Sequence, residues 1–199
     1  VAFPHCLFDE AYPYVSDLYA RLLGDEAAFR KLETWMLDHG YRSFLISNVT
    51  ASDDTLSLTY ANPLWNPKPP KGGFEYGIRH TGISVRYDAY VQTPPVLGLC
   101  IPNGLRDFLT AFDQMDPQVQ AFTARRTKRC DGCGYCVQTD KTGQRPKAFV
   151  PVQFNGNTLS LCTYFPGYAY CWSSLTRALA DDLIALLAFM DSRRPSQRQ

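Results

Sequence analysis

The hydrophobic positions in the first forty residues recur at helical spacing. Apolar side chains between Tyr12 and Leu23 fall on one face of a helix. A second helix is predicted after Asp25, whose carboxylate suits the N-cap position, and Gly40 provides a stop signal. Its apolar stripe consists of Phe29, Leu32, Trp35 and Met36. The N-terminal part of the chain therefore predicts a pair of amphipathic helices.

Beyond residue 40 the pattern changes to the alternation that is typical of half-buried strands. Polar or Pro- and Gly-rich stretches separate these segments, as expected for turns and loops. The predicted strands cover residues 41–49, 55–61, 74–78, 82–91 and 96–101.

The second half of the chain predicts helices and a hairpin. Apolar residues from Leu105 to Phe112 follow helical spacing, and Asp116 before Pro117 marks the start of another helix. Residues 148–154 and 158–162 flank Asn155-Gly156, the residue pair that a type I′ hairpin turn prefers. A last helix is predicted from a Ser174 cap to about residue 191, followed by a disordered tail.

These elements predict an α+β fold. An antiparallel sheet would be joined by N-terminal helices, a central helix pair and a C-terminal metal-tied hairpin plus helix, with no repeated βαβ units. We expect a core domain at 1–128, a cysteine-rich segment at 129–172, a helix packing on the core at 173–191 and a tail at 192–199.

Three cysteines lie within one short segment, Cys130-Asp-Gly-Cys133-Gly-Tyr-Cys136. A C-x2-C turn supplies two of the four thiolates that a structural Zn²⁺ takes in a tetrahedron, and Cys136 can reach the same ion. Cys162 is the first candidate for the fourth ligand, and Cys171 is the alternative. The sequence therefore predicts a structural zinc site.

Other roles for these cysteines remain open. The spacing also suits an iron–sulfur cluster, although the Cys-Pro that ferredoxins place shortly afterwards is missing. Disulfides fit an extracellular chain better, and seven cysteines is an odd number for full pairing. Unligated thiols are the remaining alternative.

The run RCDGCGYCVQTDKTGQRP followed by LCTYFPGYAYCW resembles a group of uncharacterised bacterial proteins that end in a cysteine-bearing segment of this kind. The resemblance covers the last third of the chain. It implies a bacterial, cytosolic protein, and it implies no activity and no catalytic residue.

Charge is unevenly distributed although the net charge is only +1. Residues 1–40 sum to −4 and residues 122–147 to +5. Basic residues beside a zinc turn can contact phosphates, and a solvated helix end is the alternative explanation. The candidate phosphate contacts are Arg125, Arg126, Lys128 and Arg129.

Neither a membrane-spanning run nor a signal peptide is visible in the sequence, which predicts a cytoplasmic protein without a membrane partner. Aromatic residues concentrate near prolines, where rings suit a ligand cleft. The candidate cleft residues are Tyr60, Trp65, Tyr76, Tyr87, Tyr168 and Trp172.

No catalytic pattern stands out in the sequence, so it identifies no catalytic residue. The leading hypothesis is a zinc-stabilised, non-enzymatic domain that binds a small molecule or peptide. The alternatives are a nucleic-acid-binding or regulatory protein that uses the basic segment, and a zinc enzyme or thiol redox switch.

Overall fold

A computed structural model describes residues 5–7, 12–49, 54–62, 82–88, 96–100, 105–130, 149–163 and 170–193. They belong to two compact units. The first, which we call the sheet unit, comprises Val1–Pro102 and Cys171–Gln199, and the second, the hairpin unit, comprises Asn103–Tyr170. Helices and antiparallel sheets together confirm the predicted α+β class. None of the described helices has the length and apolar character needed to cross a membrane.

The sheet unit contains a six-stranded antiparallel sheet whose strands are neighbours in chain order. Four of the predicted strands are confirmed, with slightly different ends, and the one predicted at 74–78 lies outside the described residues. Two short edge strands were not predicted. The strands are β1 (His5–Leu7), β2 (Arg42–Val49), β3 (Asp54–Ala61), β4 (Gly82–Asp88), β5 (Val96–Cys100) and β8 (Cys171–Trp172).

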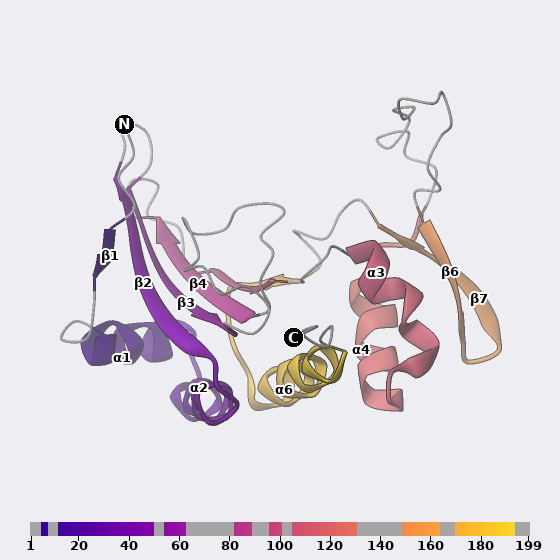
Figure 1. The fold of residues 1–199 in the computed structure, drawn as a ribbon, viewed down its shortest axis with the longest axis horizontal. Helices are drawn as coiled ribbons and strands as arrows, with labels where there is room; N and C mark the ends of the chain where they lie inside the picture. Colours follow the sequence, from indigo (N-terminus) through magenta and orange to yellow (C-terminus); the bar gives the residue numbers. More distant parts are fainter. Residues whose placement is uncertain are drawn as a thin grey trace, which may run out of the picture. The chain divides into compact units, whose positions relative to one another are not determined.

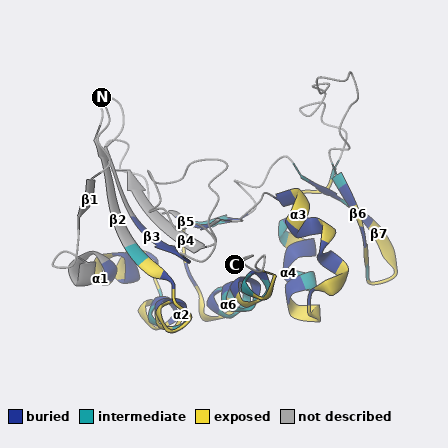
Figure 2. Ribbon diagram, viewed as in Figure 1, coloured by how far each residue is buried: buried dark blue, intermediate teal, exposed yellow. Residues whose placement is uncertain are grey.

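Three helices complete this unit: α1 (Tyr12–Leu22), α2 (Glu26–Asp38) and α6 (Arg177–Ser192). Helices α1 and α2 lie along one side of the sheet, and α6 packs against α2 (Figure 1). Their inward faces are buried and their outer faces exposed, as amphipathic periodicity requires (Figure 2). The core of this unit includes Tyr19, Leu23, Phe29, Leu32, Met36, Leu58, Leu97, Leu183, Leu186 and Leu187.

The predicted boundaries of α2 are confirmed. The Asp25 side chain accepts a hydrogen bond from the Ala28 amide at 2.9 Å, which satisfies an otherwise unpaired donor of the first turn. His39 is the C-cap, and Gly40 follows with φ +81°, a conformation that a residue with a Cβ rarely adopts.

The start of α6 corrects the sequence analysis. Its N-cap is Thr176, which accepts from the Leu179 amide at 3.2 Å, and not Ser174. Leu175 is buried, and its amide donates to the Leu23 carbonyl at 2.9 Å. This tertiary bond holds the chain outside the helix at the position where a Ser174 cap would have begun it.

The hairpin unit places helices against a two-stranded sheet. Its elements are α3 (Leu105–Thr110), the 3₁₀ turn η1 (Phe112–Gln114), α4 (Pro117–Arg126), β6 (Phe149–Phe154) and β7 (Asn157–Cys162). The predicted Asp116 cap is confirmed by its bond from the Val119 amide at 3.0 Å. The predicted turn is confirmed as well, because Asn155 and Gly156 have φ of 49° and 76°.

The hairpin unit is inserted between β5 and β8, which pair with each other in the other unit. This division differs from the predicted boundaries, because 105–126 belong with the hairpin and not with the segment 1–128. Helix α6 packs against α2 of the sheet unit and runs from Arg177 to Ser192, where the sequence predicted a helix at 173–191.

Candidate metal centre

A short antiparallel bridge places two of the predicted ligands side by side. Arg129 pairs with Leu161 in an isolated bridge, so residues 128–130 lie along β7 as a short bridge strand outside the two-stranded sheet. The Cys130 amide donates to the Ser160 carbonyl at 2.8 Å, and the Cys162 amide donates to the Lys128 carbonyl at 2.7 Å. The start of the cysteine cluster is thereby fixed next to a cysteine 32 residues further along the chain.

Cys130 and Cys162 lie on the same face of this ladder. Cys130 stands opposite Ser160, and side chains two residues apart on a strand share a face, so Cys162 is its diagonal neighbour. Diagonal neighbours are about 7–8 Å apart, with their Cβ atoms somewhat closer. A disulfide needs Cβ atoms about 3.5–4.5 Å apart, whereas two thiolates on one Zn²⁺ each add a Zn–S bond of about 2.3 Å. The diagonal arrangement thus suits shared metal ligation better than a direct bond.

The two thiols differ in burial. Cys162 is 4% exposed although it lies on the face of β7 opposite to Leu159 and Leu161, while Cys130 is half-buried. A buried thiol next to a half-buried one gives a ligand pair with one sheltered and one accessible side.

Cys171, the alternative fourth ligand, belongs to the sheet unit. It is half-buried in β8, where it pairs with Gly98 in the six-stranded sheet. Of the described cysteines, Cys162 alone has a register relation to Cys130. Cys133 and Cys136 lie outside the described residues, within which no group of three or more His, Cys, Asp or Glu side chains is close enough to hold a metal.

A buried hydrogen bond lies at the base of this ladder. The hydroxyls of Thr127 and Tyr170 are 2.8 Å apart, and both residues are almost fully buried. Burial raises the pKa of Tyr170 to about 12, against smaller lowering effects of its hydrogen bonds with Thr127 and Thr123. The phenol is therefore neutral at physiological pH and available as a hydrogen-bond donor.

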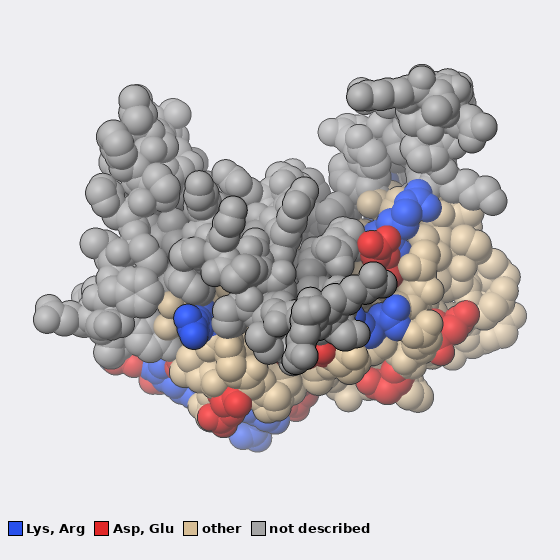
Figure 3. Space-filling model, in the orientation of Figure 1, with Lys and Arg blue, Asp and Glu red and all other residues tan. Residues whose placement is uncertain are grey.

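The candidate phosphate contacts lie in the last turn of α4 and just after it. Arg125 is exposed in the last turn of α4, Arg126 is half-buried, and Lys128 and Arg129 are exposed in the bridge strand. On the face drawn in Figure 3, acidic and basic groups of the described residues are interspersed. The described residues of this face form no continuous basic surface of the kind that tracks a nucleic-acid backbone.

The candidate cleft residues have different surroundings. Tyr60 is completely buried in the core of the sheet unit, and Trp172 is half-buried in β8. Tyr87 lies in β4, paired with Leu56. Trp65, Tyr76 and Tyr168 lie outside the described residues.

A buried polar cluster in the sheet unit was not predicted. Glu33 is 7% exposed and accepts hydrogen bonds from Ser16 at 2.7 Å, Tyr60 at 2.5 Å and Arg30 at 2.7 Å. Arg30 also pairs with Asp17. Burial lowers the pKa of Arg30, but its hydrogen bond to Glu33 and the neighbouring carboxylates raise it above its ordinary value. The cluster joins α1, α2 and β3, and no pattern in the sequence distinguishes Glu33 from the other acidic residues of α1 and α2.

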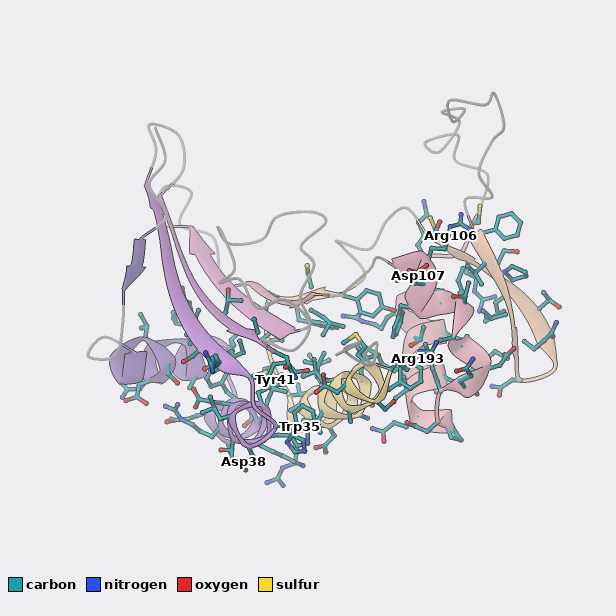
Figure 4. All side chains as sticks on the ribbon, in the orientation of Figure 1. Trp35, Asp38, Tyr41, Arg106, Asp107 and Arg193 are labelled. Atoms are coloured by element: carbon teal, nitrogen blue, oxygen red, sulfur yellow. The ribbon has the colours of Figure 1, made fainter. Side chains whose placement is uncertain are left out.

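An aromatic group lies at the end of α2. The rings of Trp35 and His39 stack with centroids 4.0 Å apart, and Tyr41 lies 6.1 Å from Trp35 at a tilt (Figure 4). The His39 ring nitrogen Nδ1 is 2.7 Å from the Trp35 carbonyl. His39 therefore closes the helix end, as expected for a capping histidine.

Comparisons of the chain with protein-family models, with curated proteins and with solved structures found no match.

Proposed function

We propose that this is a zinc-stabilised, non-enzymatic binding protein, in which Cys130, Cys133, Cys136 and Cys162 hold one structural Zn²⁺. The observation that carries the proposal is the Arg129–Leu161 bridge, because it sets Cys130 and Cys162 on one face at a separation that suits shared ligation. Cys133 and Cys136 follow Cys130 by three and six residues, well within the reach of the chain.

The neighbouring cations support a thiolate site. Four thiolates and one Zn²⁺ carry a net charge of −2, which nearby positive side chains stabilise. Lys128 stands opposite Cys162 on the face that Cys130 shares, and Arg125 and Arg129 are close to Cys130 in the sequence. A thiolate-bound metal also suits a reducing, cytoplasmic setting, which we propose for this protein.

The zinc would stabilise the fold and would take no part in a reaction. A site closed by four cysteines has no open position for substrate or water, so its contribution is folding free energy. The proposed ligand is a small molecule or peptide, in line with the aromatic residues that concentrate in segments 60–65 and 164–172 of the sequence.

The test is metal analysis of the full chain, purified from medium of defined metal content. We expect one zinc per chain in the wild-type protein, and loss of that zinc in Cys130→Ser and Cys162→Ser. Cys171→Ser is the matched control and should keep the metal. Metal-free wild-type protein, or a loss of zinc in Cys171→Ser alone, would contradict the proposal.

Nucleic-acid binding is the second candidate function, favoured by the exposed Arg125, Lys128 and Arg129 beside the proposed zinc. It predicts an affinity for DNA or RNA that falls steeply with salt, with a smaller slope in Lys128→Gln. If these cations only balance the thiolate charge, Lys128→Gln weakens zinc binding and nucleic acid does not bind at low salt.

A further inference from the structure

The chain enters and leaves the cysteine-bearing segment through the same buried contact. Thr127 is the first residue after α4, and Cys130 follows three positions later. Tyr170 is the last residue of the hairpin unit, eight positions after Cys162. The 2.8 Å hydrogen bond between the Thr127 and Tyr170 hydroxyls therefore joins the two ends of the segment that contains all four proposed ligands.

The Thr127 end of this contact leads directly into the ladder. The Thr127 amide still donates to the Thr123 carbonyl at 2.9 Å, as the C-cap of α4. The next residue, Lys128, already accepts from the Cys162 amide at 2.7 Å. The ladder begins at the residue that follows Thr127, so no linker between them can absorb a displacement of Thr127 before it reaches Cys130.

The Tyr170 end is held rigidly. Its ring packs edge-on against Phe108 with centroids 6.4 Å apart, and at a tilt against Phe122 at the same separation. These rings come from α3 and α4, and Tyr170 is 1% exposed. A ring fixed by two helices offers the Thr127 hydroxyl a partner that does not move with the ladder.

We propose that Thr127 and Tyr170 are positioning residues of the metal centre, and that their hydrogen bond holds Cys130 at the register where it faces the same ion as Cys162. This inference rests on the proposed zinc site. Residues that orient metal ligands through hydrogen bonds commonly change metal affinity by about 10–100-fold when they are removed. Preorganisation explains the effect, because an unclamped strand must be ordered when the metal binds.

The test measures zinc affinity of the full chain by competition with a chelator of known affinity. Tyr170→Phe and Thr127→Val each remove one hydroxyl with little change of volume, and we expect each to weaken zinc binding about ten-fold. The double variant should bind no more weakly than Tyr170→Phe, because Tyr170→Phe already lacks the bond to Thr127. Thr127→Ser keeps the hydroxyl and should bind zinc within about two-fold of wild type.

A second readout separates positioning from general loss of stability. Amide hydrogen exchange of the zinc-loaded chain should accelerate at Cys130 and Cys162 in Tyr170→Phe, because these amides form the ladder bonds. Val152→Ala is the control, since it removes core volume from β6 without touching the contact. It should accelerate exchange throughout β6 and β7.

The outcomes distinguish this inference from the proposed function. If wild-type protein holds zinc but Tyr170→Phe and Thr127→Val bind it equally well, the positioning role is overturned and the zinc site stands. If Thr127→Ser, which keeps the hydroxyl, bound zinc much more weakly than the wild type, the role of the hydroxyl would be overturned as well. If the wild-type protein holds no zinc, both proposals fall.

Discussion

The two units keep their structures by different means. In the sheet unit, Glu33 joins α1, α2 and β3 by accepting from Ser16, Arg30 and Tyr60, within an extensive apolar core. In the hairpin unit, two short helices cover a two-stranded sheet. Asn103–Tyr170 falls below the about 70–80 residues at which one hydrophobic core usually suffices. The proposed zinc supplies what this smaller core lacks.

The contrast shows in which kind of unit a bound metal adds most to stability. A large sheet can bury a charged cluster, because many neighbours hold each partner in place. A small unit gains more from a few strong bonds between distant segments, and the four cysteines of the proposed site span residues 130–162. We therefore expect perturbations of the two units to be separable.

Metal removal should have the largest effect, and only on the hairpin unit. Chelation should unfold most of it, because site formation contributes folding free energy. Amides of β6 and β7 should lose most of their protection from hydrogen exchange, while β3 amides keep theirs. Cys171→Ser should behave as the wild type. Equal protection in both units before and after chelation would show that the hairpin unit folds without metal.

Loss of the Glu33 carboxylate should have the next largest effect, on the sheet unit. Glu33→Ala leaves the buried hydroxyls of Ser16 and Tyr60 without this acceptor, and we expect the free energy of unfolding to fall by about 3 kcal/mol. Denaturant titration measures the change. Asp38→Asn, at an exposed position of α2, should change stability by less than about 0.5 kcal/mol. Unchanged zinc affinity in Glu33→Ala would sharpen the separation between units.

High pH should weaken the hairpin unit through Tyr170. Burial raises its pKa to about 12 in the folded chain, against about 10 in an unfolded one. The folded state therefore holds this proton more tightly, and the stability it contributes is complete below about pH 10 and is lost as the pH rises to about 12.

Unfolding of the hairpin unit should become easier by about 2 kcal/mol across that range. Denaturant titrations on either side of it measure the change. Tyr170→Phe should lose the part of this pH dependence that comes from Tyr170, while the other tyrosines still ionise. A variant with the same pH profile as the wild type would assign the effect to those other groups.

The helix caps should give the smallest effects, and similar ones in both units. Asp25→Ala and Asp116→Ala each remove a side-chain acceptor from the first turn, at a cost of about 1 kcal/mol. In metal-free protein, Asp116→Ala should reduce helicity in circular dichroism less than Asp25→Ala, because chelation has already unfolded most of the hairpin unit. Equal losses would indicate that the hairpin unit is as stable without metal as the sheet unit.

Local signals allowed much of the fold to be predicted. Asp25, Asp116 and the Asn155-Gly156 turn depend on chemistry within a few residues, and each was located correctly. The start of α6 was misplaced because Ser174 and Thr176 have similar capping chemistry. The choice between them is made by the bond from Leu175 to Leu23, which is distant in sequence.

Other features depend on partners that a sequence pattern does not contain. The edge strands β1 and β8 have three and two residues, too few to show alternation, and they exist through their pairing with β2 and β5. The sequence around Glu33 does not distinguish it from the nearby acidic residues, because its partners Tyr60 and Ser16 come from other elements. Cysteine spacing predicted Cys130 and Cys162 as ligands. The pairing of Arg129 with Leu161 that joins them is a tertiary contact, which cysteine spacing does not encode.

The pairing of β5 with β8 has a consequence for the history and engineering of this chain. Gly98 stands opposite Cys171, so the points where the polypeptide departs from the sheet and returns to it are neighbours. A tight reverse turn between Cys100 and Cys171 would give an uninterrupted protein of one module. Because its two ends leave and rejoin the sheet at neighbouring residues, the cysteine-bearing module can be inserted or deleted as one piece without changing the strand order of the sheet unit.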